Sequence, residues 1–291
     1  MSLLLWIVGV FMNILAYFEL LRTKNCISAS IGALISALIA SNFQFNYSKE
    51  LILIFLVVFL ICGYGNAIND ICDLEIDKIN KPERPIPSGR VSLKSAKIFS
   101  TIIVILGVFL SFFNIYCTLL AIFNAIVLYL YAKRYKKNKI VGNVLVGYLT
   151  GSVFLFGGIA VNNVYDIGIL FVSALLAIWS REIIKDYEDI EGDELEGVIS
   201  LPIKNKPFSL KLATLLLILA ILVSPIPYLI GIFGIYYLIA IIICDILFLL
   251  ALYPILKSKF GKKDIDAKKI SKNIKLTMNL VLLSYIIGSI L

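Results

Sequence analysis

Two stretches of this sequence repeat the same spacing of carboxylates. Asn69 to Asp77 reads NDICDLEID, and Lys185 to Asp193 reads KDYEDIEGD. Aspartates stand at the second, fifth and ninth position of each stretch: Asp70, Asp73 and Asp77, then Asp186, Asp189 and Asp193. The chain holds only 19 acidic residues, so six of them in one repeated pattern indicate a shared chemical task.

This spacing is suited to binding a metal ion. On a helix, Asn69, Asp73 and Asp77 share one face, and Asp189 and Asp193 repeat the four-residue step. No lysine or arginine lies between residues 66 and 77, so Asp70 and Asp73 have no cationic neighbour one helical turn away. Carboxylate and amide oxygens suit Mg²⁺, which often bridges to phosphates. We predict that these five residues hold Mg²⁺, and that the two clusters face each other across a diphosphate. A solvated acidic face is the alternative.

A proline-rich loop follows the first acidic stretch. It reads KINKPERPIPSGR from Lys78 to Arg90. Its three prolines prevent a continuous helix and stiffen the chain, and Ser88-Gly89 is typical of a turn. Arginine binds phosphate oxygens through a planar fork of N–H donors. We therefore predict that Arg84 contacts a phosphate group, with anchoring of the loop at the membrane surface as the alternative.

The composition is that of a membrane protein. Of the 291 residues, 60% are hydrophobic, and the mean hydropathy is +0.96. Apolar runs long enough to span a bilayer as helices occupy residues 26–43, 50–68, 93–113, 115–132, 140–160, 165–182, 209–228, 233–256 and 276–291. We predict an all-α polytopic membrane protein with a single domain over residues 1–291. Residues 1–22 would form a helix on the membrane surface, and Met12 is an alternative start.

The basic residues are distributed unevenly between the loops. Loops on one side of the predicted spans hold Lys49 alone, out of 27 lysines and arginines. The positive-inside rule places the other side, with the N-terminus and both acidic stretches, in the cytoplasm, and the C-terminus outside. The net charge of +8 reflects this asymmetry and does not indicate a nucleic-acid partner. The absence of histidine excludes the usual zinc sites and a histidine general base.

These motifs resemble those of a known family. NDICDLEID, the following RPIPSGRVS and the second stretch KDYEDIEGDELEGVISLPI are similar to motifs of the UbiA superfamily of intramembrane prenyltransferases. Glu19 to Ile35 and Tyr131 to Gly158 look like the first-span and fifth-span regions of that family. REIIKDYEDIEGD and LTGSVFLFGG are most similar to archaeal members that make ether lipids. Ser200 departs from the threonine found in many relatives but keeps the hydroxyl.

The resemblance implies a fold, a reaction and partners. It implies nine transmembrane helices around a central cavity, Mg²⁺, and a prenyl diphosphate donor. The reaction would transfer a geranylgeranyl group to the free hydroxyl of geranylgeranylglyceryl phosphate, in contact with membrane lipids. Candidate catalytic residues are Asn69, Asp70, Asp186 and Lys185. Candidate diphosphate-binding residues are Arg22, Arg84, Tyr131, Lys133 and Lys136. Metal ligands would be Asn69, Asp73, Asp77, Asp189 and Asp193.

Other functions remain open from the sequence. A prenyltransferase with an aromatic acceptor would share the donor site and differ in the acceptor pocket. A secondary transporter also uses repeats, but its site usually lies near mid-membrane. A cation channel needs a symmetric ring of acids, which two helices do not provide.

Two further features have structural interpretations. Gly147 and Gly151 form a pair typical of a close helix contact. Asp245 lies near the middle of a predicted span, far in depth from the acidic stretches. We expect it to form a hydrogen bond between helices.

Overall fold

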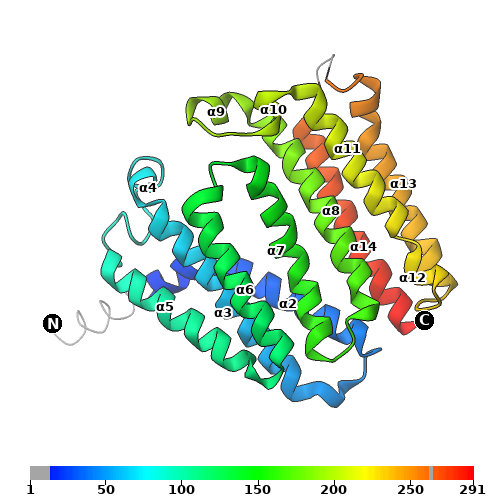
Figure 1. Ribbon diagram of the computed structural model, residues 1–291, viewed down its shortest axis with the longest axis horizontal. Helices are drawn as coiled ribbons and strands as arrows, with labels where there is room; N and C mark the ends of the chain where they lie inside the picture. Colours follow the sequence, from blue (N-terminus) through cyan, green and yellow to red (C-terminus); the bar gives the residue numbers. More distant parts are fainter. Residues whose placement is uncertain (1–13, 262–264) are drawn as a thin grey trace, which may run out of the picture. The chain divides into compact units, whose positions relative to one another are not determined.

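The computed structural model describes residues 14–261 and 265–291 and is almost entirely helical there (Figure 1). Nine helices in these ranges are long and apolar enough to cross a membrane, as predicted. Their main segments are α2 (Thr23–Ala40), α3 (Ser48–Cys72), α5 (Leu93–Leu110), α6 (Ile115–Leu130), α7 (Lys139–Ala160), α8 (Tyr165–Glu188), α11 (Lys206–Val223), α13 (Ile235–Lys257) and α14 (Ala267–Ile290). The chain is therefore a multi-pass membrane protein. Of the surface helix predicted over residues 1–22, residues 14–21 are helical and residues 1–13 lie outside the described ranges.

Short helices extend or connect these spans. They are η1 (Phe45–Tyr47), α4 (Leu74–Asn80), η2 (Ser111–Phe113), η3 (Tyr131–Tyr135), α9 (Ile190–Leu195), α10 (Leu201–Lys204) and α12 (Ile226–Leu229). The observed spans agree closely with the predicted apolar runs, except that α14 starts at Ala267 rather than at residue 276. The Asp266 side chain caps this helix by accepting from the Lys269 N–H at 2.9 Å. Apolar content identifies the part that crosses the membrane, whereas a lysine-rich turn continues the helix beyond it.

Apolar side chains on the spans face outward. Along α5, Ile102, Ile105 and Phe109 are 56%, 63% and 64% exposed. These residues recur at helical spacing, so they form one outer stripe. A long stripe of this kind is typical of a surface that contacts lipid.

The chain divides into two compact units. Unit 1 comprises the chain up to Leu34 and residues 48–133, and unit 2 comprises residues 35–47 and 134–291. In unit 1, α3 packs against α5 and α6. Its core includes Leu20 and Ala67, with Ile86 and Val91 from the proline-rich loop. The loop is thus anchored by buried apolar side chains.

In unit 2, α8 packs against α7, α11 and α14 (Figure 1). The approach of α7 to α8 depends on glycine. A Cβ added at Gly147 would lie 2.9 Å from the Leu175 carbonyl oxygen, and one at Gly151 would lie 3.1 Å from the Phe171 carbonyl oxygen. The predicted close contact at this pair is confirmed.

The carboxylate of Asp245 joins two helices of unit 2. The Ser224 hydroxyl, at the end of α11, lies 2.8 Å from Oδ2 of Asp245 on α13. The Tyr237 hydroxyl donates to the Ser224 carbonyl oxygen at 2.6 Å. The predicted hydrogen bond between helices is confirmed, and it supplies the partner that a polar group needs within a bilayer.

Candidate active site

The first acidic stretch continues a span past a helix break. Helix α3 ends at Cys72 and α4 starts at Leu74, with Asp73 between them. The Asp73 N–H still donates to the Asn69 carbonyl oxygen at 2.9 Å, and the Asp77 N–H donates to that of Asp73 at 2.8 Å. The four-residue helical step therefore passes through the break.

The second acidic stretch has the same local structure. Asp189 separates α8 from α9, which starts at Ile190. Its N–H donates to the Lys185 carbonyl oxygen at 3.1 Å, and the Asp193 N–H donates to that of Asp189 at 2.9 Å. The repeat seen in the sequence is thus a repeat of backbone structure, with the middle aspartate at the break in each copy.

Two arginines bind the carboxylates of the first stretch. Asp70 and Asp77 are buried, with 3% and 5% exposure. Arg84 Nη1 lies 3.1 Å from Asp70 Oδ1 and 2.5 Å from Asp77 Oδ2. Arg22 Nη2 lies 2.5 Å from the same Asp70 oxygen. We call Asn69, Asp70, Asp73 and Asp77, with Arg22 and Arg84, the first cluster.

The fold of the proline-rich loop directs Arg84 to this cluster. Gly89 adopts φ +76, as the predicted turn requires, and its N–H donates to the Ile86 carbonyl oxygen at 3.1 Å. The other loop arginine, Arg90, forms two hydrogen bonds with Glu19, at 2.5 and 3.0 Å. The bond to Glu19 raises the pKa of the Arg90 guanidinium above its usual value. Arg90 is therefore committed to a structural ion pair.

Arg22 reaches the cluster from a strained backbone position. It lies between the helical residues 14–21 and α2, and it adopts φ +52. A left-handed conformation costs roughly 1–2 kcal/mol for a residue other than glycine. The Arg22 carbonyl oxygen accepts from the Asn25 N–H at 2.8 Å, which stabilises the turn. Strain of this kind recurs at functional sites.

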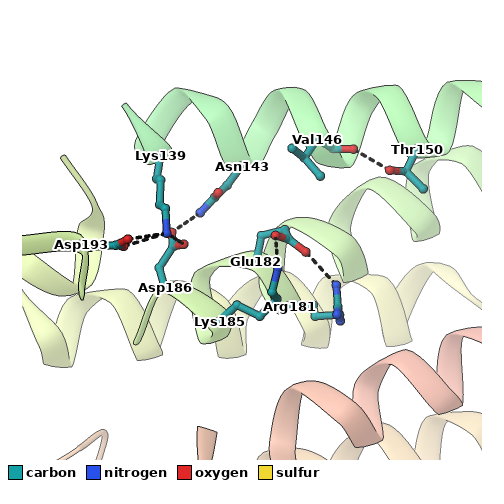
Figure 2. A network of polar contacts seen from close by, with 9 residues as sticks. All are labelled: Lys139, Asn143, Val146, Thr150, Arg181, Glu182, Lys185, Asp186 and Asp193. Carbon is teal, nitrogen blue, oxygen red and sulfur yellow. Dashed lines mark hydrogen bonds and ion pairs between the residues drawn. The ribbon is translucent and has the colours of Figure 1, made fainter. Parts of the chain in front are cut away.

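Lys139 lies between two carboxylates of the second stretch (Figure 2). Its Nζ lies 3.1 Å from Asp186 Oδ1 and 2.7 Å from Asp193 Oδ2. Asn143 donates through Nδ2 to Asp186 Oδ2 at 2.6 Å. Asp189, in contrast, is exposed. We call Asp186, Asp189 and Asp193, with Lys139 and Asn143, the second cluster.

The backbone holds Lys139 in this position. The Lys139 N–H donates to the Ile199 carbonyl oxygen at 2.8 Å, and the Ile199 N–H donates to that of Lys137 at 2.9 Å. The start of α7 is thus joined to the segment that follows the second stretch. Neither Lys139 nor Asn143 is among the site residues predicted from the sequence. Their four-residue spacing at the start of a span was the available signal, since it places a cation and an amide on one face.

Other predicted residues have different partners. Lys185 Nζ lies 3.2 Å from Glu182 Oε2, and no motif carboxylate among the described residues pairs with it. Lys133 Nζ donates to the Tyr129 hydroxyl at 3.0 Å. Tyr131 lies within η3, a single π-turn, and Lys136 directly follows that turn. The roles assigned to these residues stay predictions.

The donor atoms of the first cluster fit a hard cation. Asn69 Oδ1 is buried and has no hydrogen-bond partner among the described residues. An amide oxygen in that state is a ligand available to a metal, and the neighbouring donors are carboxylate oxygens. The described residues hold no ready-made group of three or more acidic or sulfur side chains around one metal position. Arg84 and Lys139 instead supply positive charge to the carboxylates.

Sequence comparison gives a family match over most of the chain. A model of the UbiA prenyltransferase family matches residues 29–279. The chain is 59% identical, over 279 residues, to a digeranylgeranylglyceryl phosphate synthase from Methanococcus maripaludis strain C6. That alignment covers 96% of this chain and 99% of the relative.

Structural comparison agrees. A solved structure described as giving structural and mechanistic insights into digeranylgeranylglyceryl phosphate synthase in membranes has a TM-score of 0.91 and 56% identity. The match covers 96% of this chain and 99% of that chain. A UbiA homolog from Archaeoglobus fulgidus, bound to DMAPP and Mg²⁺, has a TM-score of 0.70 at 17% identity, with 94% and 98% coverage. At that identity the likeness shows the fold alone.

Proposed function

The chain belongs to the UbiA prenyltransferase family, and from this membership we propose that it transfers a geranylgeranyl group from geranylgeranyl diphosphate to the free hydroxyl of geranylgeranylglyceryl phosphate. The allylic carbon–oxygen bond of the donor breaks, an ether bond forms, and diphosphate and the hydroxyl proton are released. The 59% identity to the Methanococcus maripaludis enzyme, over nearly the whole chain, carries this proposal. Membership of a prenyltransferase family decides against the transporter and channel alternatives.

The proposed reaction requires Mg²⁺. Asn69, Asp73 and Asp77 would hold it in the first cluster, and Asp189 and Asp193 in the second. Asn69 Oδ1, which is buried and has no hydrogen-bond partner among the described residues, supports this assignment, as does the Mg²⁺ in the Archaeoglobus fulgidus homolog. When bound, Mg²⁺ supplies positive charge that stabilises the leaving diphosphate.

The cationic side chains of the chain have a related role. Arg84 is held by a stiff loop, and its guanidinium carries more N–H donors than its two carboxylate contacts use. We assign those donors to diphosphate oxygens, where charge grows as the donor bond breaks. Arg22 and Lys139 hold Asp70 and Asp186 in place. Positive charge fixed before the reaction starts is what such a transition state requires.

The proposed orientation puts both clusters on the cytoplasmic side. Lysines and arginines lie almost entirely in the loops on that side of the predicted spans. Water-soluble diphosphate would then leave into the cytoplasm, while the prenyl chains stay in apolar surroundings. Exclusion of water near the allylic carbon protects a cationic transition state from hydrolysis.

The test is a reconstituted reaction. Purified protein in nanodiscs receives Mg²⁺ and geranylgeranyl diphosphate, with geranylgeranylglyceryl phosphate in one series and 4-hydroxybenzoate in another. Each series is run with and without EDTA, and the alkylated product and diphosphate are measured. We expect Mg²⁺-dependent product with the glyceryl phosphate alone.

Other results would overturn the acceptor, the role of Mg²⁺ or the reaction separately. Product with the aromatic acid alone would keep the family and overturn the acceptor. Product that persists in EDTA would overturn the role of Mg²⁺. Failure with both acceptors, in protein shown to be folded, would overturn the proposed reaction.

A further inference from the structure

A second group of charges lies on α8, deeper in the span than the second cluster. Arg181 Nη1 lies 2.7 Å from Glu182 Oε1, and Lys185 Nζ lies 3.2 Å from Glu182 Oε2. The group carries two positive charges and one negative charge. Ionisable residues within a span are costly and are functional candidates by default.

Arg181 has hydrogen-bond donors that no described residue uses. Its Nε is buried and has no hydrogen-bond partner there. Among the described residues, Glu182 is the only ion-pair partner of Arg181 and of Lys185. The nearby Asp186 pairs with Lys139. A buried guanidinium N–H without an acceptor is unfavourable. An anionic ligand would supply the missing acceptor.

The surface of α8 changes from apolar to ionic toward this group. Ser173, Ala177, Arg181 and Lys185 follow one another at four-residue steps and so form one ridge of the helix. Ala174, Ile178, Glu182 and Asp186 form the neighbouring ridge. Figure 2 shows the ionic members of both ridges along α8.

An apolar cavity lies at the other end of both ridges. It has a volume of about 180 Å³ and lies within unit 2. Ser173, Ala174, Ala177 and Ile178 line it, together with Phe154 of α7 and Met278 of α14. At 1.5 Å of rise per residue, Arg181 is about 7.5 Å along the helix axis from Asp186. Along α8, an apolar cavity is thus followed by Arg181, whose Nε has no acceptor in the described part of the chain, and then by Asp186 of the second cluster.

A cationic group beside an apolar cavity suits a ligand that carries a phosphate at one end of a hydrocarbon chain. We propose that Arg181, together with Lys185, binds the phosphate of the prenylglyceryl phosphate acceptor, and that the part of the acceptor's hydrocarbon chain nearest the glycerol enters the cavity. This inference rests on the proposed function. Arg84 is assigned to the donor diphosphate, so the acceptor phosphate needs a cationic site of its own.

The experiment compares acceptors with and without the phosphate. Wild type, Arg181→Met and Arg181→Lys are assayed with Mg²⁺ and geranylgeranyl diphosphate in nanodiscs of uncharged lipid. The acceptors are geranylgeranylglyceryl phosphate and geranylgeranylglycerol. Arg181→Lys keeps the ion pair with Glu182 and removes the guanidinium fork, so it serves if Arg181→Met fails to fold. Lys211→Met is the matched control, because Lys211 is an exposed cation on α11 that lies over the Phe260 ring.

We expect a selective change in one Michaelis constant. Loss of charge-assisted hydrogen bonds to phosphate should raise KM for the phosphorylated acceptor about 10- to 100-fold in Arg181→Met, and about 3- to 10-fold in Arg181→Lys. In the Arg181 variants, KM for the donor and the turnover of geranylgeranylglycerol should stay within about twofold of wild type, because neither involves the Arg181–phosphate bond. In Lys211→Met, KM for the donor and KM for the phosphorylated acceptor should also stay within about twofold of wild type.

Three results would overturn the inference. The first is a rise in KM for the donor instead, which would assign Arg181 to diphosphate. The second is an equal loss of turnover with both acceptors, which would give Arg181 a structural role. The third is an unchanged KM for the phosphorylated acceptor. If wild type itself makes no product from that acceptor, the proposed function fails, and this result is distinct because it appears before any substitution.

Discussion

Arg84 and Arg90 belong to the same proline-rich loop and have different partners. Arg84 contacts two buried aspartates of the first cluster, whereas Arg90 pairs with Glu19 near the surface. The two residues have the same chemistry and a similar position in the chain. Comparing the two arginines therefore tests the role proposed for Arg84 at the diphosphate against the role of Arg90 in holding the loop.

We predict opposite effects of replacing them. Arg84→Met should lower kcat/KM for the donor about 100- to 1,000-fold, because it removes fixed positive charge at the leaving group. Arg90→Met should leave kcat/KM within about threefold of wild type and lower the thermal midpoint by a few degrees at most, since an exposed ion pair contributes little. Steady-state kinetics and thermal unfolding of both variants provide the check. Equal activity losses in the two variants would count against a specific role for Arg84.

For individual residues, the sequence predicts which side chains belong to the acidic stretches better than it predicts which side chains pair with each other. The four-residue spacing of Asn69, Asp73 and Asp77 predicted a shared helical step, and the backbone hydrogen bonds confirm it. The spacing could not distinguish Lys139 from the lysines around it, because a lysine that anchors a loop and one that binds two carboxylates look alike. Likewise, Lys185 stands inside the motif but contacts Glu182, since side-chain pairing depends on three-dimensional packing.

Among the helices, the pair α7 and α8 carries most of the second cluster. Lys139 and Asn143 come from α7, and Asp186 comes from α8. The distance between these side chains depends on how closely the two helices approach, and Gly147 and Gly151 set that approach. A substitution at either glycine, although remote from any charged side chain, should therefore move the α7 backbone relative to α8 and change the distances within the second cluster.

We predict that Gly147→Ala destabilises the protein and that Gly168→Ala does not. The new methyl group at residue 147 would meet a backbone oxygen at 2.9 Å, whereas nothing lies within 4 Å of the corresponding position at Gly168 on α8. Forced separation of packed helices costs about 1–3 kcal/mol, which corresponds to a fall of about 2–6 °C in the thermal midpoint. Thermal unfolding in detergent tests both variants. Equal midpoints would mean that α7 and α8 can move apart freely.

Sequence patterns predicted the spans because lipid imposes length and apolarity on each helix separately. They could not predict the start of α14, since its first turns lie in a lysine-rich segment without an apolar signal. The small-residue pair in α7 was predicted, but its partner helix was not. Local composition carries no information about which neighbour a helix meets.

The whole chain has a predicted direction in the membrane. The proposed orientation puts the basic loops in the cytoplasm and the C-terminus outside, and it follows from the placement of 27 lysines and arginines. We predict that alkaline phosphatase fused after Leu291 is active in a bacterial host, because the reporter folds only outside the cytoplasm. A fusion after Lys257, which lacks α14, should be inactive. The reverse pattern of activity would invert the orientation and put both acidic clusters on the outer side.

The position of helix α2 determines when it can complete its contacts during synthesis of the chain. Its first part, up to Leu34, belongs to unit 1, and the rest belongs to unit 2. The Ser36 hydroxyl donates to the Phe154 carbonyl oxygen, a partner 118 residues later in the chain. At a synthesis rate of about 5–20 residues per second, that partner emerges roughly 6–24 s after Ser36. After α2 is inserted, the part that follows Leu34 therefore lacks its α7 partner until α7 has been synthesised. During that interval the insertion machinery or the surrounding lipid has to cover the surface that α7 later contacts.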